Sequence, residues 1–177
     1  AGRVDQRARK LKLKENTANL GMAHTRRATH GVPSEKNAHP HASKDIFIVH
    51  NGIVENHEEL KAQLRAEGMR FSSQTDSEVV AHLVQYYVEK GQSFEKAVFN
   101  AIKKLKGAYA LGILNKKEPE QLIGIRNQSP LVLGKGFQEN FIASDVMALA
   151  PVTNKLIYFD DGQVAVIKKT ILDISTT

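Results

Sequence analysis

The feature that most constrains the fold is a change in hydrophobic period near residue 108. Before it, apolar residues recur at helical spacing, and after it the chain becomes a series of short apolar runs separated by turn residues. These runs cover residues 108–114, 121–125, 130–133, 140–143, 156–159 and 163–167. The connections between the runs are too short for crossover helices, so we expect antiparallel pairing, with Asp161-Gly162 as a hairpin turn. Helices followed by such strands predict an α+β domain.

Three amphipathic helices are predicted ahead of the strands. The first follows Asn56, which forms a capping-box pattern with Glu59, and it ends near Gly68. The second follows Asp76, and the third follows Ser93 as its N-cap. Their apolar stripes are interpreted as core rather than as ligand sites.

Composition narrows the class of protein. The 177 residues, 41% hydrophobic and 25% charged, fit one soluble globular domain over residues 1–177. No apolar run approaches a membrane span, and the lack of cysteine excludes disulfides and thiolate metal sites. The net charge of +6 owes much to a basic stretch over residues 1–14, which could bind phosphates. Because no aromatic residue interleaves with it and no nucleic-acid motif follows, nucleic-acid binding remains the third hypothesis.

A polar block between residues 24 and 52 is too rich in imidazole and guanidinium groups to be core. Five of the seven histidines lie in it, namely His24, His30, His39, His41 and His50. The adjacent Arg26 and Arg27 are suited to a carboxylate or phosphate, because a guanidinium presents parallel donors. A metal site on three of the histidines is the competing interpretation. A proline between two of them and the lack of a carboxylate partner argue against it, so no metal is predicted.

The dipeptide Asn51-Gly52 and the carboxylate of Asp76 can each be interpreted as structural or as functional. Asn51-Gly52 follows the apolar run 46–49, where a strand should end, and the Asn51 amide and the Gly52 N–H could both face a developing negative charge. The same dipeptide is typical of a tight turn. Asp76 could bind a cation, or it could be the N-cap of the helix that follows it.

Four motifs, in order and spacing, resemble the glutaminase domain of the glucosamine-6-phosphate synthase family of class II glutamine amidotransferases. They are His24-Thr-Arg-x-Ala-Thr-His-Gly31, Pro33-Ser-Glu-x-Asn-Ala-His-Pro-His41, Val49-His-Asn-Gly-Ile-Val-Glu-Asn56 and Thr75-Asp-Ser-Glu78. The resemblance runs from about residue 2 to the C-terminus. It implies the αββα layered sandwich of N-terminal-nucleophile hydrolases, with mostly antiparallel sheets, in a cytoplasmic enzyme without a cofactor.

The resemblance also implies a reaction and a site. Glutamine is hydrolysed to glutamate and ammonia, and the ammonia is transferred to fructose 6-phosphate on a sugar isomerase domain. Asn51 and Gly52 would be the catalytic pair at the oxyanion, Arg26 would bind the α-carboxylate of glutamine, and Asp76 would bind its α-ammonium. A zwitterionic substrate needs one such fixed cation and one fixed anion.

The sequence departs from the family pattern at two places, one in the loop expected over the substrate and one at the start of the chain. Thr29 and His30 would shape the loop that closes over glutamine, whereas Arg27 stands where the family usually has tryptophan. Family members begin with a nucleophilic cysteine, a strand and a helix, but this chain begins at Ala1 and has no cysteine. We therefore expect this N-terminal segment and the sugar isomerase domain to be missing and the chain alone to be inactive. A non-catalytic glutamine-binding module is the alternative, and a homodimer is compatible with the resemblance.

Overall fold

The computed structural model describes residues 17–25, 31–32 and 34–176. The helices are α2 (His57–Ala66), α3 (Glu78–Glu89), α4 (Phe94–Ile102) and the short 3-10 helix η2 (Val146–Ala148). The strands are β1 (His41–Ser43), β2 (Ile46–Gly52), β3 (Tyr109–Asn115), β4 (Leu122–Asn127), β5 (Val132–Lys135), β6 (Asn140–Ala143), β7 (Leu156–Tyr158), β8 (Gln163–Ile167) and β9 (Leu172–Thr176).

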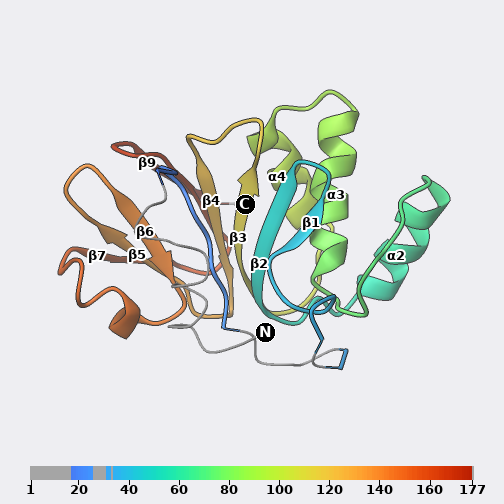
Figure 1. The fold of residues 1–177 in the computed structure, drawn as a ribbon, viewed down its shortest axis with the longest axis horizontal. Coiled ribbons are helices and arrows are strands. Elements are labelled where there is room, and N and C mark those ends of the chain that lie inside the picture. The colour runs from blue at the N-terminus through green and yellow to red at the C-terminus, as the bar shows by residue number, and fades with distance from the viewer. Residues whose placement is uncertain (1–16, 26–30, 33, 177) are drawn as a thin grey trace.

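The strands form two sheets, and a layer of helices covers one of them (Figure 1). The larger sheet has six strands in the order β1-β2-β3-β4-β8-β9, and the smaller has three in the order β6-β5-β7. Every pair of neighbouring named strands is antiparallel. The prediction of an antiparallel α+β domain is therefore confirmed, although β1 and β9 were not predicted as strands.

Alternate residues of the central strands enter two different hydrophobic cores. Ile46 and Ile48 of β2 lie in the core that the sheet shares with the helices. Leu122 and Ile167 face the other way and join Leu133 of β5 in the core between the two sheets. The period of two along each strand thus builds a helix–sheet–sheet stack.

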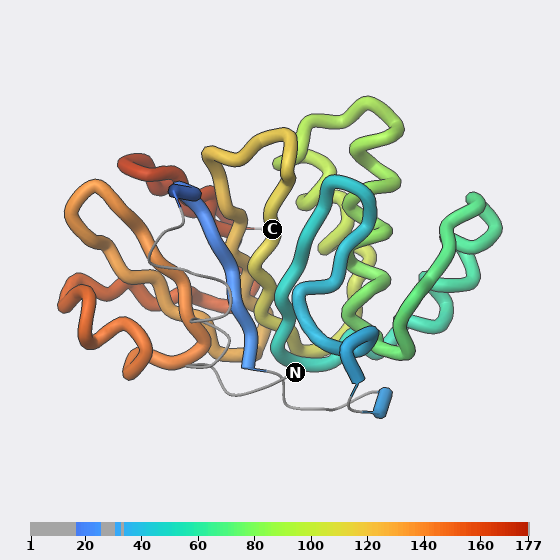
Figure 2. The backbone as a smooth tube through the Cα atoms, viewed as in Figure 1, coloured from blue at the N-terminus to red at the C-terminus, as the bar shows by residue number. Residues whose placement is uncertain are grey.

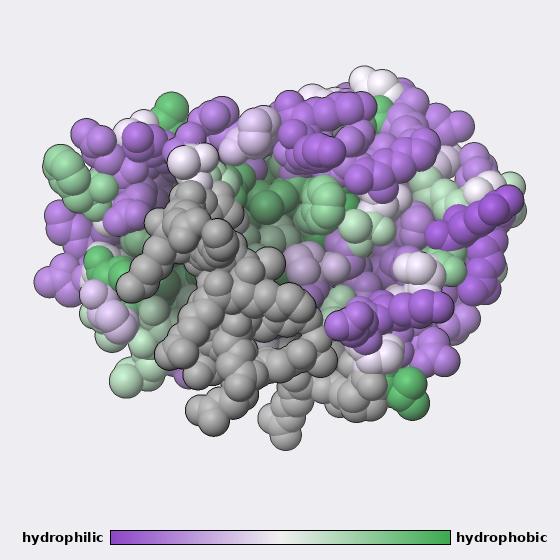
Figure 3. Space-filling view, in the orientation of Figure 1, coloured by the Kyte–Doolittle hydropathy of each residue, from purple (hydrophilic) through white to green (hydrophobic). Residues whose placement is uncertain are grey.

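The face of the large sheet that looks toward the small sheet carries half-buried apolar side chains near β2. Phe47, Val49 and Leu114 on β2 and β3 are half-buried. Figure 3 shows apolar side chains gathered in a hollow over the middle of the molecule, between more polar outer surfaces. Residues 17–25 cross this region as an extended segment, and Leu20 and Met22 pack against the second core (Figure 2).

The three predicted helices occur at the expected positions, but the predicted cap of α2 is wrong. The Ser93 hydroxyl accepts a bond from the Lys96 N–H at 3.4 Å, which confirms the predicted N-cap of α4. Asn56 stands at the N-cap position of α2, but its side chain makes no cap bond. Its amide instead accepts from the Lys106 N–H at 2.9 Å and donates to the Lys104 carbonyl at 2.8 Å. The capping-box prediction is wrong because a distant backbone segment satisfies both ends of the amide. No helix in the described ranges is both long and apolar enough to cross a membrane.

The predicted hairpin at Asp161-Gly162 is also wrong. A turn does occur there, with φ +79° at Gly162, but β7 before it belongs to the small sheet and β8 after it to the large one. The Gly162 N–H donates to the Arg126 carbonyl at 2.9 Å, and the Asp161 carboxylate accepts from the Gln128 N–H at 2.8 Å. The turn is therefore attached to the end of β4, where the chain passes from one sheet to the other.

Candidate active site

Asn51 and Gly52 are the last two residues of β2, where they lie opposite Ala110 and Tyr109 of β3. They are paired strand residues, so the tight-turn interpretation is wrong. Gly52 has φ +121°, and a Cβ there would overlap the carbonyl oxygen of Ala108 and lie 2.8 Å from the Tyr109 Cα. Only glycine fits this backbone at this distance from its neighbour.

The Asn51 side chain is held by its carbonyl end. Its Oδ1 lies 2.8 Å from Nε2 of His24, which comes from the extended segment 17–25. A carbonyl oxygen only accepts hydrogen bonds, so His24 Nε2 is the donor. This leaves the Nδ2 group of Asn51 as the donor that can face a ligand.

Asp76 reaches the same corner from the segment before α3. Its side chain is 2% exposed, and its Oδ2 accepts from the Val54 N–H at 2.8 Å and lies 4.0 Å from Nδ1 of His50. The N-cap position of α3 lies one residue further on, at Ser77, which makes no side-chain cap bond. The carboxylate is anchored two residues beyond Gly52, beside the end of β2.

Histidines and hydroxyl groups connect these residues. The Ser77 hydroxyl lies 2.8 Å from Nδ1 of His50 and 3.2 Å from Nε2 of His39. The His39 ring lies 4.2 Å from that of His24 and 4.7 Å from that of His41, centroid to centroid. Within the described ranges, no three side chains of His, Cys, Asp or Glu are arranged to hold a metal ion. The imidazoles are used for hydrogen bonding to hydroxyl groups and to Asn51.

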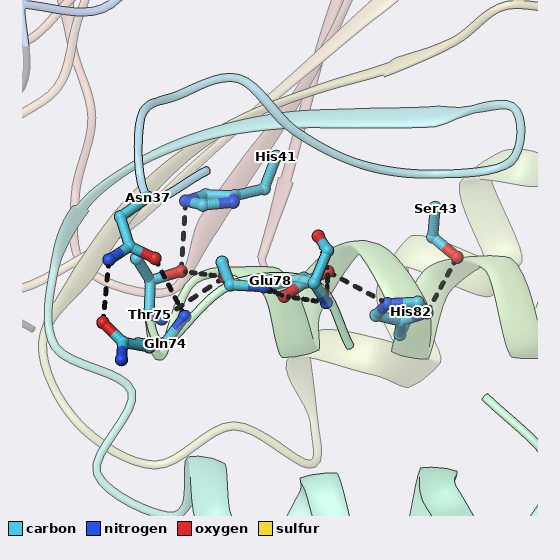
Figure 4. Close-up of polar contacts among 9 residues, drawn as sticks. Asn37, His41, Ser43, Gln74, Thr75, Glu78 and His82 are labelled. Atoms are coloured by element: carbon cyan, nitrogen blue, oxygen red, sulfur yellow. Dashed lines mark hydrogen bonds and ion pairs between the residues drawn. The ribbon is translucent and has the colours of Figure 1, made fainter. Parts of the chain in front are cut away.

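The polar segment 72–78, which contains Asp76 and Ser77, makes hydrogen bonds to the chain before β1 and to β1 (Figure 4). Asn37, 2% exposed, accepts from the Gln74 N–H at 2.9 Å and donates to the Gln74 side chain at 3.1 Å and to the Val32 carbonyl at 2.9 Å. The Thr75 hydroxyl lies 3.1 Å from Nε2 of His41. The segment therefore binds both the loop before β1 and β1 itself.

Glu78 closes this segment with a buried carboxylate. Its side chain is 2% exposed and accepts from the backbone N–H and the hydroxyl group of both Ser72 and Ser73, at 2.7 to 2.8 Å for each shortest contact. His82 Nε2 lies 3.5 Å from it, and His82 Nδ1 lies 2.9 Å from the Ser43 hydroxyl on β1. Burial alone would raise the pKa of Glu78, but the contacts with His82, Ser72 and Ser73 together lower it far below its ordinary value.

We expect Asn37→Asp to lower the free energy of unfolding by about 2 kcal/mol, because a carboxylate would face the Val32 and Gln74 oxygens without a donor. Urea unfolding measures the change. Asn100→Asp is the matched control, since its amide donates only to the Gln92 side chain among the described residues and should cost under about 1 kcal/mol. Equal effects of the two variants would contradict the role given to Asn37.

The structure thus brings together three of the predicted site residues, Asn51, Gly52 and Asp76. The predictions for Arg26, Thr29 and His30 lie outside the described residues, as does the position of Arg27. Sequence reasoning missed His24 and Ser77 as partners of the site. The density of histidines around residue 24 was the available signal, whereas Ser77 carried none beyond its place in the Thr75-Asp-Ser-Glu78 motif.

Comparisons with known proteins agree on one family. The sequence family described as glutamine amidotransferase domain matches residues 24–151. The glutamine–fructose-6-phosphate aminotransferase (isomerizing) of Acinetobacter baylyi is 47% identical over 173 residues, which are 98% of this chain and 28% of the relative. The enzyme of the same name from Escherichia coli K12 is 51% identical over 154 residues, which are 87% of this chain and 25% of the relative. The chain therefore spans about a quarter of the length of these relatives.

Solved structures support the fold. The glutamine phosphoribosylpyrophosphate amidotransferase of Bacillus subtilis, in complex with ADP and GMP, superposes with a TM-score of 0.70 at 25% identity, covering 86% of this chain and 34% of that one. A glutamine aminotransferase class-II domain protein from Silicibacter pomeroyi gives a TM-score of 0.59 at 17% identity, covering 78% and 70%. The second likeness concerns the fold alone. Both confirm the predicted fold class.

Proposed function

Because this chain belongs to the glutamine amidotransferase domain family, as the match over residues 24–151 shows, we propose that it binds L-glutamine at the end of β2. It has the antiparallel α+β fold of the N-terminal-nucleophile amidotransferases. The observation that carries the proposal is that an oriented amide lies at the end of β2 and that a buried carboxylate binds the Val54 N–H two residues beyond Gly52.

The Asn51 amide and the Gly52 N–H are the proposed oxyanion donors. Attack on the side-chain amide of glutamine places a negative charge on its oxygen, and fixed donors stabilise that charge without reorganising. The bond from His24 to the Asn51 carbonyl supports this role, since it leaves the Nδ2 donor outward. Only glycine fits at position 52 because the Ala108 carbonyl lies so close, and the N–H of Gly52 is therefore not shielded by a side chain of its own residue.

Asp76 is the proposed partner of the substrate α-ammonium. A buried carboxylate that keeps one oxygen on a backbone N–H has a fixed position, which favours recognition of a cation at a defined distance. Arg26 is proposed for the α-carboxylate, and Thr29 and His30 for the loop over the substrate, on the strength of the motif they occupy. No cofactor is required by this chemistry.

In the longer protein, we propose that the ammonia passes to a sugar isomerase domain and is transferred to fructose 6-phosphate in a cytoplasmic enzyme, as the names of the relatives suggest. The 177 residues contain no cysteine, so they supply no thiol nucleophile. A non-catalytic glutamine-binding module is the second candidate. Release of glutamate from glutamine by the 177 residues would exclude that candidate.

Calorimetric titration tests the proposed site. We expect the chain to bind L-glutamine at least 10-fold more tightly than glutaramate, the analogue without the α-ammonium group, because a fixed carboxylate is worth more than about 1.4 kcal/mol to a buried cation. Asp76→Asn keeps the shape and an acceptor for the Val54 N–H, and it should abolish this preference. Asp145→Asn, a control at the exposed η2 cap, should leave it unchanged. Retention of the full preference by Asp76→Asn would contradict the assignment.

A further inference from the structure

We infer that His24 is a positioning residue that keeps the Asn51 amide in its productive orientation. The geometry of this inference is independent of the proposed function, whereas its consequence for catalysis rests on that function. An asparagine amide has two ends of similar shape and a broad terminal torsion, so the strand alone does not decide which end faces the substrate. If the Asn51 side chain were reversed, its carbonyl oxygen would face the oxyanion and repel it.

The hydrogen-bonding capacity of His24 selects one orientation. Its Nε2 lies 2.8 Å from Asn51 Oδ1. Its Nδ1 is buried and has no hydrogen-bond partner among the described residues. A proton on Nδ1 would leave a buried donor unsatisfied, whereas a proton on Nε2 is used by Asn51. The neutral ring is therefore the Nε2–H tautomer, and it accommodates the carbonyl end of Asn51 and rejects the NH₂ end.

A series of side-chain contacts links the His24 ring to β2. The ring lies against His39 with centroids 4.2 Å apart and planes 36° apart. His39 Nε2 contacts the Ser77 hydroxyl at 3.2 Å, and the same hydroxyl contacts His50 Nδ1 at 2.8 Å. His50 directly precedes Asn51 in β2, and its side chain points to the opposite face of the sheet, so these contacts link the His24 ring to the backbone of the strand that carries Asn51. Ser77 thereby relates the extended segment 17–25 to the strand that carries the donor.

Two NMR measurements test the geometry without activity. In the ¹⁵N-labelled chain, the histidine nitrogen shifts should show His24 as the Nε2–H tautomer, and the order parameter of the Asn51 Nδ2 group should be that of a fixed side chain, because its carbonyl end is bound. His24→Phe keeps a ring against His39 but removes the donor, so this order parameter should fall below about 0.6. His24→Gln restores an N–H donor and should recover part of the order. An Nδ1–H tautomer in the unchanged chain, or an unaltered Asn51 order parameter in His24→Phe, would overturn the inference.

Kinetics of the full-length enzyme that carries this chain test the catalytic consequence. His24→Phe should lower kcat for glutamine hydrolysis by about 10- to 100-fold and change KM by less than about two-fold. This fall in kcat is no larger than the fall expected from removing one oxyanion donor outright. A purely structural role would move KM or stability instead. If glutamine does not bind at all, the proposed function fails while the NMR result still decides the role of His24. A rise in KM with unchanged kcat would contradict positioning.

Discussion

Replacing Gly52 by alanine is expected to lower the free energy of unfolding by about 3–5 kcal/mol, from a strained φ angle and a steric overlap together. The backbone has φ +121° at this position, and the added Cβ would overlap the Ala108 carbonyl oxygen, which accepts the Ile53 N–H at 2.8 Å. Relief requires β2 and β3 to separate where the proposed oxyanion donors lie. Glutamine binding should therefore be lost together with stability.

Two other glycines separate the causes of this effect. Gly91→Ala has a positive φ of +84° but nothing within 4 Å of the new Cβ, so it should cost only about 1–2 kcal/mol for the backbone conformation. Gly124→Ala, on β4, meets its nearest neighbours at 3.4–3.5 Å with no positive φ and should be nearly neutral. Denaturant unfolding of the three variants gives the comparison. A Gly52→Ala variant no less stable than Gly91→Ala would show that the strands adjust without cost.

Glu78→Gln is expected to lower the free energy of unfolding by about 3 kcal/mol, because an amide cannot accept all the donors of Ser72 and Ser73 and brings an NH₂ group toward them. For a chain of this length, that loss corresponds to a melting temperature about 6–12 °C lower. Thermal unfolding measures it. Glu89→Gln is the control on the same helix: its partly exposed carboxylate pairs with Lys44 on the surface, so the change should cost under about 1 kcal/mol.

The same carboxylate gives stability a defined dependence on pH. Its pKa is lowered in the folded state from an ordinary value of 4.5. The unfolded chain therefore binds this proton more readily, and the contribution of Glu78 is complete above pH 4.5 and is lost progressively as pH falls toward the folded pKa. The difference in stability between the unchanged chain and Glu78→Gln should accordingly shrink between pH 6 and pH 3. A difference that stays constant would contradict the lowered pKa.

Local signals in the sequence were reliable where one element decides the outcome. The stripe that begins after Ser77 and the cap at Ser93 predicted α3 and α4, because helical period and capping depend on neighbours in the chain. The motifs that resemble glutaminases also gave Asn51, Gly52 and Asp76, which the fold brings together. Their proximity depends on the Val54 N–H binding Asp76, a contact across 22 residues.

The errors occurred where a short polar signal has a distant partner. Asn51-Gly52 has the composition of a turn, yet seven residues of β2 pair with β3 through to Gly52. Asp161-Gly162 is a turn whose second strand pairs with β4 rather than with β7. Asn56 had the right neighbours for a capping box, but its amide binds a segment about 50 residues further on. No local pattern distinguishes these outcomes, since the competing contact is set by tertiary structure.

Successive residues of β2 face two different cores, so inserting or deleting a single residue within this strand would exchange the side chains that the two cores receive. Deleting one residue between Ile46 and Val49 would send Ile46 into the space between the sheets and turn Phe47 toward the helices, while the end of the strand stays fixed by Gly52 against Ala108. Gains or losses of chain length are therefore expected in turns such as residues 116–121, which join β3 to β4. Any transplantation of this site onto another sheet must carry β2 and its β3 partner as one unit, because the strand's phase fixes which side of the sheet carries the amide.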